Sequence, residues 1–211
     1  MYCFEVLSEI NLDAEELSRQ AADFEAVFSK GLNDKDNDVR VASLKAVTAF
    51  LAVIEDQAIV MKFVSVLDLI LMIVVEALNI DEDQGRVALE SLGELTNAHA
   101  EVWKSPAKLL QVITQVLQNT KLDDSTRSAA SEVVLSLSGT MPAALRKTPE
   151  TQSLLFPALV SMFMEIEKND QVWTETEEDA DNVDKNPVST ATSVLSRLSE
   201  DLGGKTTMAC A

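Results

Sequence analysis

Apolar residues return every three or four positions between Phe28 and Leu51, and a short polar segment interrupts them. This spacing places apolar side chains on one face of a helix. The pattern predicts a helix that ends near Lys30, a polar turn, and a second helix from Asp38 to Glu55. The second helix has two neighbouring apolar stripes, so more than one neighbour must cover it. The stripes are Val39, Ala42, Ala46, Ala49 and Val53, and Leu44, Val47, Leu51 and Ile54.

The polar turn contains residues that end and begin helices. Gly31 and Asn33 tolerate the left-handed backbone found just past a helix end, so the first helix is predicted to stop there. Asp34, Asp36 and Asp38 offer side-chain acceptors to the free N–H groups that open the second helix. A tight helix–turn–helix unit follows.

The same unit returns twice, each time with an arginine near the start of its second helix. Arg40 and Arg86 are 46 residues apart, and Arg86 and Arg127 are 41 residues apart. A period of roughly 40–47 residues is typical of HEAT and armadillo arrays. The spacing from Asp34 to Arg40 favours HEAT. The predicted fold is therefore all-α, a HEAT-repeat α-solenoid of about four helix pairs with partial ends.

We expect one continuous array over residues 1–211. In the last pair, Pro157 is expected to kink the first helix. Terminal repeats of a solenoid need polar caps, and neither end shows one, so the chain is expected to be a piece of a longer protein. The predicted parts are a partial repeat (1–11), helix pairs (13–55, 58–103, 105–147 and 149–204, the last with a loop at 170–186) and the start of another element (205–211).

The formal net charge of −18 narrows the range of partners. Phosphates would be repelled, so nucleic acid is excluded as a partner, whereas basic proteins would be attracted. The alternative is that the charge only keeps the chain soluble. Cys3 and Cys210 lie at opposite ends, which is typical of a reduced intracellular protein rather than of a disulfide framework or a zinc site.

The most apolar stretch, Ile59 to Ile80, is interpreted as a buried helix rather than a membrane span. Lys62, Asp68 and Glu76 interrupt it, and its longest uncharged part, Leu69 to Val75, is far shorter than the ~20 residues that cross a bilayer. Neither membrane insertion nor a signal peptide is predicted.

No motif predicts catalysis, a cofactor or a metal. The sequence has no P-loop, GxGxxG, HExxH or nucleophile elbow. Its single histidine, His99, is interpreted as a surface residue near a helix end. The protein is therefore expected not to be an enzyme.

Two acidic features are candidate protein-binding surfaces. The first, the acidic stripe, consists of Glu90, Glu94, Asn97 and Glu101, whose spacing of 4, 3 and 4 places them on one helical face. The second, the acidic segment, lies in the loop at 170–186 and has no apolar period. The alternatives are an ordinary solvated face and a flexible linker. The candidate residues of the segment are Trp173, Glu175, Glu177, Glu178, Asp179, Asp181 and Asp184.

Three stretches together resemble the importin-beta (karyopherin-beta) family, most of all its importin five, or karyopherin beta-three, branch. They are SEVVLSLSGTMPAALRK (131–147), Val172-Trp173 before the acids, and ATSVLSRLSEDLGGK (191–205). The resemblance spans nearly the whole chain and is looser over residues 28–103.

This resemblance implies a nuclear import receptor that works in the cytoplasm and the nucleus. Such receptors bind basic cargo signals on the inner face of a long HEAT solenoid and make weak contacts with Phe-Gly nucleoporins. They release cargo when the GTP form of the GTPase Ran binds. In relatives an acidic loop contacts Ran or cargo, and Glu175 to Asp184 holds a comparable position; in the stripe, Glu94 and Asn97 match. The alternative is a HEAT scaffold of a phosphatase or of a chromosome-organising complex.

Overall fold

The computed structural model describes residues 19–165 and 186–204. Every regular element in these ranges is helical, which confirms the predicted all-α class. The chain forms two compact units that divide between Lys104 and Ser105, and each is described by itself. The predicted partial repeat at 1–11 and the predicted element at 205–211 lie outside the described residues.

Unit 1 consists of two helix pairs, α3 with α4 and α6 with α7. Two short elements precede α6 and one follows α7. The bounds are α3 (Ala21–Leu32), α4 (Asn37–Val53), α5 (Gln57–Val60), the 3-10 turn η1 (Met61–Val66), α6 (Leu67–Ile80), α7 (Glu82–Ala98) and the 3-10 turn η2 (Ala100–Val102).

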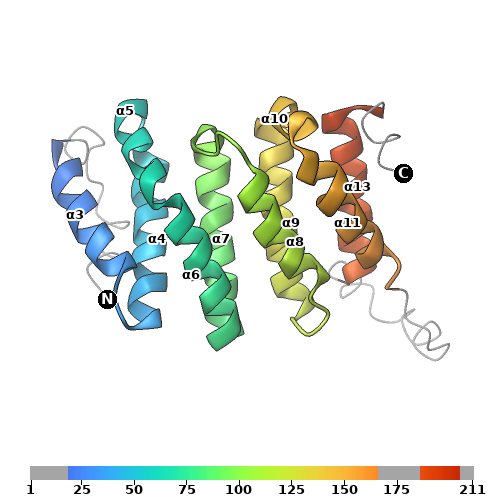
Figure 1. Ribbon diagram of the computed structural model, residues 1–211, viewed down its shortest axis with the longest axis horizontal. Helices are drawn as coiled ribbons and strands as arrows, with labels where there is room; N and C mark the ends of the chain where they lie inside the picture. The colour runs from blue at the N-terminus through green and yellow to red at the C-terminus, as the bar shows by residue number, and fades with distance from the viewer. Residues whose placement is uncertain (1–18, 166–185, 205–211) are drawn as a thin grey trace, which may run out of the picture. The chain divides into compact units, whose positions relative to one another are not determined.

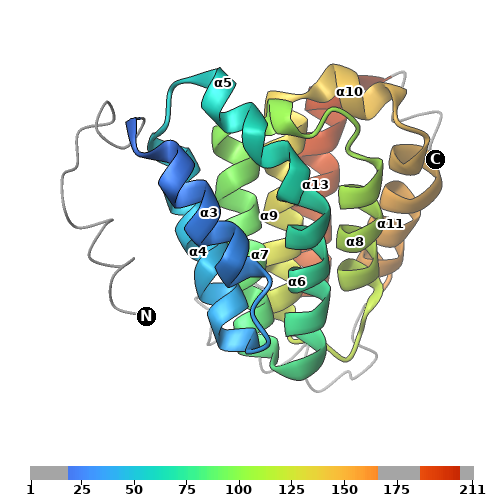
Figure 2. The same ribbon diagram turned by 60° about the vertical axis from the view of Figure 1, so that its left-hand side comes forward.

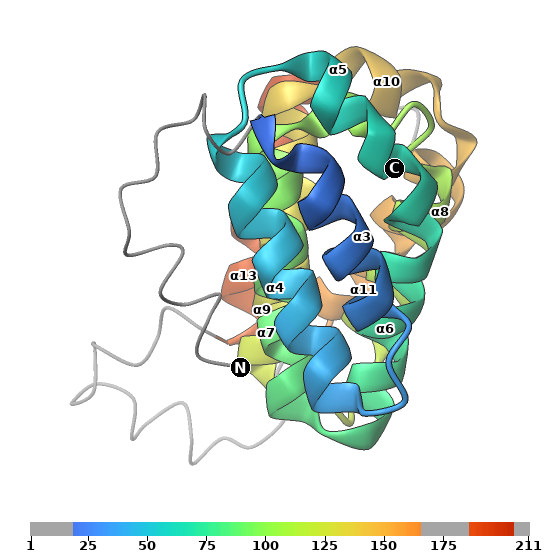
Figure 3. The ribbon, with the colours of Figure 1, turned by 90° about the vertical axis from the view of Figure 1, so that its left-hand side faces the viewer.

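The helices of unit 1 form two layers, shown in Figure 2 and from the α3 end in Figure 3. The first helices, α3 and α6, lie in one layer, and the second helices, α4 and α7, lie in the other. The closest association is between α4 and α7. Within unit 1, each second helix therefore packs against its own first helix and against the other second helix, as the double apolar stripe predicted.

Between the layers of unit 1 lies an apolar core. In α4, the stripe of Leu44, Val47, Leu51 and Ile54 is at most 1% exposed, whereas Val39 and Val53 of the other stripe are 37% and 49% exposed. Around one end of the core, Phe24, Phe28, Phe50 and Phe63 pack with ring centroids 5.2–6.3 Å apart. Aromatic pairs at these separations stabilise a core beyond the area that they bury.

The turn between α3 and α4 corrects one expectation. Neither Gly31 nor Asn33 has a positive φ, so neither ends the helix by left-handed backbone. Asn33 is the residue after α3, with φ −100°, and Gly31 lies inside the helix. A Cβ at Gly31 would stand 2.1 Å from the Ser43 hydroxyl oxygen, so this glycine permits the close approach of α3 and α4.

Aspartate side chains open both second helices of unit 1. Asp36 accepts from the N–H of Asp38 at 2.9 Å, and Asp34 accepts from the N–H of Asp36 at 3.0 Å. At the start of α7, Asp81 accepts from the N–H groups of Asp83 and Gln84 at 3.0 and 3.4 Å. These carboxylates satisfy donors that the helix itself leaves free.

The cap at Asp81 gives a first prediction. Asp81→Ala is expected to lower the free energy of unfolding by about 1 kcal/mol, because two N–H groups lose their acceptor. Asp81→Asn keeps an acceptor oxygen and is expected to cost only a few tenths of a kcal/mol. Urea unfolding followed by far-UV circular dichroism measures both. Equal losses in the two variants would show that the cap does not stabilise the helix.

One described stretch, Gln57–Ile80, passes the length and composition test for a membrane span. In the structure it is divided into α5, η1 and α6 rather than being one helix. Ile70, Ile73, Val74 and Ala77 of α6 are 0% exposed, and α6 packs against α7 and α4. We therefore interpret the stretch as part of the core of unit 1.

Unit 2 also has two layers, with α8 and α11 in one and α9 and α13 in the other (Figure 1). The core between them is aliphatic and includes Leu110, Ile113, Val133, Leu137 and Leu159, all 0% exposed. The bounds are α8 (Ala107–Gln118), α9 (Asp124–Thr140), α10 (Pro142–Lys147), the π turn η3 (Thr151–Leu155), α11 (Phe156–Phe163) and α13 (Pro187–Leu202).

Local features of unit 2 follow from its prolines and glycines. Pro157 has no N–H and lies in the first turn of α11, and the chain widens into the π turn η3 directly before it. Asn186 caps α13 by accepting from the N–H of Ser189 at 2.7 Å, and Gly203, with φ 80°, ends that helix. The short helix α10 between α9 and η3 was not predicted from the sequence.

Candidate protein-binding surface

The first three residues of the acidic stripe lie on the solvent-exposed side of α7. Glu90, Glu94 and Asn97 are exposed, whereas Leu89 and Leu92 on the opposite side are 0% exposed. The carboxylates of Glu90 and Glu94 are one helical turn apart, so both present negative charge to the same side of the helix. This part of the predicted stripe is an exposed polar surface with two carboxylates.

Glu101 does not continue that surface along the helix. The helix α7 stops at Ala98, and Glu101 lies in the 3-10 turn η2, whereas the predicted stripe placed Glu101 on the same helix as Glu90 and Glu94. The chain turns because Val102 and Trp103 are buried, and the Trp103 indole N–H donates to the Thr96 hydroxyl at 3.1 Å. Burial of this tryptophan outweighs the continuation of the helix.

His99 connects Glu101 to α4. One ring nitrogen, Nδ1, lies 3.1 Å from the Glu101 carboxylate, and the other, Nε2, lies 2.8 Å from the Leu51 carbonyl oxygen. The side chain of His99 is 12% exposed, so the interpretation of His99 as a surface residue is wrong. The sequence carries no signal for this contact, since Leu51 is 48 residues away.

The environment of Glu101 favours its charged form. Partial burial acts to raise the pKa of Glu101, but hydrogen bonds from its own backbone, His99 and Gln57, and the charge of His99, together lower it. The pKa of Glu101 is therefore below its ordinary value. Its carboxylate is already engaged by His99, unlike those of the exposed Glu90 and Glu94, which have no hydrogen-bond or ion-pair partner among the described side chains.

Arginines near the start of α4 and α9 reach the following helix pair, either its first helix or the residues just after that helix. Arg40 lies 2.7 Å from the Glu76 carboxylate in unit 1. In unit 2, Arg127 is 2% exposed, makes two 2.7 Å bonds to Glu165, and donates through Nε to the Leu117 carbonyl at 3.0 Å. In the sequence, the spacing of these arginines indicated only the period of the repeat. Their contacts show that they join neighbouring helix pairs.

The acidic segment falls on residues that the structure does not describe. Trp173 and the six acids from Glu175 to Asp184 are all outside the described ranges. The described residues on either side are Glu165, paired with Arg127, and Asn186, the cap of α13.

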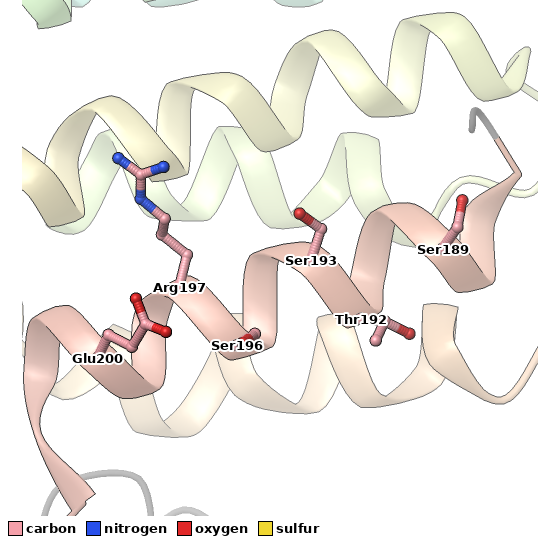
Figure 4. Close-up of a pocket in the computed structure, with 6 residues that line it drawn as sticks. All are labelled: Ser189, Thr192, Ser193, Ser196, Arg197 and Glu200. Atoms are coloured by element: carbon pink, nitrogen blue, oxygen red, sulfur yellow. The ribbon is translucent and has the colours of Figure 1, made fainter.

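A shallow depression of about 520 Å³ lies on the exposed side of α13. No pattern in the sequence indicated it. Figure 4 shows its side chains, which come from one helix only. A surface made by one helix is open rather than enclosed, so it offers no site where a group would be shielded from water. Its residues are Ser189, Thr192, Ser193, Ser196, Arg197 and Glu200. Within the described ranges, no group of three or more His, Cys, Asp or Glu side chains could hold a metal ion.

Two family models match consecutive parts of the chain. The model described as "IPO5-like, TPR repeats" matches residues 4–106, and the model described as "Importin repeat" matches residues 119–209.

Solved structures of Kap121p share the fold. Kap121p bound to Pho4p superposes with a TM-score of 0.82 at 20% identity, and Kap121p bound to Nup53p with 0.79 at 21%. Kap121p bound to the extreme C-terminus of the protein phosphatase Cdc14p gives 0.78 at 21%. Each match covers 98% of this chain and 20% of the Kap121p chain, so this chain spans about a fifth of that length.

The likeness confirms the predicted HEAT-repeat architecture. The spacing of the arginines agrees with it, because 46 and 41 residues lie in the HEAT range and exceed the 34-residue period of tetratricopeptide repeats.

Proposed function

Because the chain belongs to the importin-beta family, we propose that it is part of a nuclear import receptor that binds proteins carrying basic localisation signals. The proposed activity is protein binding without catalysis. It takes place while the receptor passes between the cytoplasm and the nucleus.

The observation that carries this proposal is the exposed acidic surface on α7. Glu90 and Glu94 stand one turn apart on a second helix, with Asn97 on the following turn, and the whole chain has a net charge of −18. Lys and Arg side chains are attracted to such a surface, which speeds their encounter and makes binding sensitive to salt. Asn97 adds hydrogen-bonding groups that can orient a peptide backbone.

Three further points support a receptor of extended protein segments. Kap121p, which shares the fold, has been solved bound to Pho4p, Ste12p, Nup53p and the C-terminus of Cdc14p. The acidic segment, with Trp173 and the acids from Glu175 to Asp184, supplies a second candidate surface for cargo or for Ran. In a helical array each pair touches only its neighbours, so two ligands that favour different curvatures would oppose each other's binding.

Binding of a Lys-rich signal peptide tests the cargo site. Fluorescence anisotropy at low and near-physiological salt is expected to show binding that weakens as salt rises. The variant Glu90→Lys/Glu94→Lys is expected to raise Kd by about tenfold or more, because each exposed lysine repels the peptide. A second variant with Lys at Glu175, Glu177 and Glu178 tests the acidic segment in the same way.

A matched control separates a local site from the total charge. Asp23→Lys/Asp68→Lys changes the net charge by the same amount at two exposed positions on α3 and α6, in the layer opposite the one that carries the stripe. It is expected to change Kd by less than about threefold. If it weakens binding as much as the stripe variant does, the peptide responds to overall charge and the proposed site is wrong.

Nucleotide-dependent binding of Ran separates the receptor from the alternative scaffold function. A receptor segment is expected to bind Ran·GTP more tightly than Ran·GDP and to release the peptide when Ran·GTP is added. Equal binding of both forms, together with no peptide binding at either salt, would favour a HEAT scaffold. Weak retention on a Phe-Gly nucleoporin resin is the further expectation for a receptor.

A further inference from the structure

The imidazole of His99 stands between two acceptors from different elements. Nε2 is 2.8 Å from the carbonyl oxygen of Leu51, in the last turn of α4, and Nδ1 is 3.1 Å from the carboxylate of Glu101 in η2. His99 itself is the residue that follows α7. One side chain therefore connects the ends of two consecutive second helices.

The number of hydrogen bonds at this junction depends on one proton. A carbonyl oxygen cannot donate, and the lowered pKa of Glu101 keeps its carboxylate an acceptor. A neutral imidazole has a single N–H and can serve only one of the two acceptors, whereas imidazolium has two N–H groups and serves both. Protonation changes the junction from one hydrogen bond to two.

Negative rather than positive groups face the ring. The carbonyl end of α4 carries the partial negative charge of a helix C-terminus, and neither α4 nor α7 has a basic residue in its last turn. Glu101 faces Nδ1 directly, and the uncharged Gln57 of α5 bonds to Glu101. Along the chain, the acids nearest to the Leu51 end of α4 are Glu55 and Asp56. The nearest bases are Lys45 for Leu51 and Lys104 for His99, and both are exposed.

We propose that His99 is a proton-dependent tie between α4 and α7, which holds these two helices together more strongly when its imidazole is protonated. Since α4 and α7 make the most extensive helix contact in unit 1, the tie acts on the packing of the layer that carries Glu90 and Glu94. The proposal stands on these contacts and does not depend on what the protein binds.

The direction of the pH effect follows from linkage. A group that gains partners in its protonated form stabilises the fold most where the unfolded chain's histidine is itself protonated, below about pH 6.5. This contribution is lost when a rise in pH removes the second ring proton. His99 is the only histidine in the chain, so few other side chains titrate between pH 5.5 and 7.5.

Thermal unfolding of the wild type and of His99→Gln, each measured at pH 5.5 and at pH 7.5, tests the tie. The difference in Tm between them is expected to be larger at pH 5.5 than at pH 7.5, by about 3 °C or more. Glu101→Gln, which removes the charge but keeps an acceptor, is expected to reduce this pH dependence. A difference in Tm that is the same at both pH values would overturn the proposal.

Nitrogen-15 NMR of the wild type provides a test that needs no variant. At pH 5.5 both ring N–H protons of His99 are expected to exchange slowly with water, because each is held by an acceptor. At pH 7.5 the population with two protected N–H protons is expected to fall. Fast exchange of both protons at pH 5.5 would show a ring that is open to solvent and would refute the tie.

Discussion

Glu165→Gln is expected to lower the free energy of unfolding by about 2–3 kcal/mol, the largest effect of the single substitutions considered. The amide keeps one acceptor but removes the charge that faces Arg127, whose side chain is 2% exposed. A buried cation without its counter-charge has a large desolvation cost. Urea unfolding, followed by circular dichroism, measures the loss.

Substitution of the partner residue, Arg127, is expected to lower the free energy of unfolding by a smaller amount. In Arg127→Met the buried charge itself disappears, and Glu165, 28% exposed, can turn toward water. The remaining cost is the Leu117 carbonyl, which loses the Arg127 Nε–H donor, and we expect a loss of about 1–2 kcal/mol. The double variant is expected to resemble Arg127→Met, because its amide no longer faces a buried cation.

Asp83→Asn is the matched control, since it makes the same change in the Asp83–Arg86 pair. That pair is 2.8 Å long, compared with 2.7 Å for Arg127–Glu165, but the Asp83 side chain is 83% exposed. The free energy of unfolding is expected to change by no more than about 0.5 kcal/mol. If Glu165→Gln lowers the free energy of unfolding no more than Asp83→Asn does, burial does not increase the contribution of the Arg127–Glu165 pair to stability.

Gly85→Ala is expected to destabilise unit 1 by about 2 kcal/mol, although alanine is the better helix former by about 1 kcal/mol. A Cβ at Gly85 would stand 2.5–2.7 Å from Leu78, and one of the atoms that it meets is the Leu78 Cα. Side-chain rotation cannot move a backbone atom, so α6 would have to shift away from α7. Thermal and urea unfolding measure the effect.

Gly139→Ala is the control for this substitution. Gly139 also lies within a helix, α9, but nothing stands within 4 Å of the added Cβ. Helix propensity alone then applies, and a stabilisation of up to about 1 kcal/mol is expected. The two glycines should therefore give changes of opposite sign. A stabilising Gly85→Ala would mean that α6 and α7 are not in tight contact.

Local signals in the sequence predicted much of the fold. Asp36 caps the helix that its position indicated, and the stripe from Leu44 to Ile54 is buried. These signals act over three to five residues, so one segment contains all the information. The exposure of Glu90 and Glu94 followed from the same periodicity.

Contacts between distant residues could not be predicted in this way. The His99–Leu51 and Arg127–Glu165 contacts join residues 48 and 38 positions apart, and they depend on how helices pack. Gly31 was misinterpreted because a glycine near a helix end indicates either a positive φ or a close approach, and the sequence does not distinguish them. Glu101 left the stripe because burial of Trp103 ended α7 early.

The position of Trp103 gives unit 1 its own optical reporter. The chain has two tryptophans, Trp103 and Trp173, so a Trp173→Phe variant emits from a single indole that is 4% exposed. Its fluorescence spectrum would shift to longer wavelength when unit 1 opens, whereas circular dichroism follows the helices of both units. Comparing the two transitions would show whether the units unfold together or one after the other.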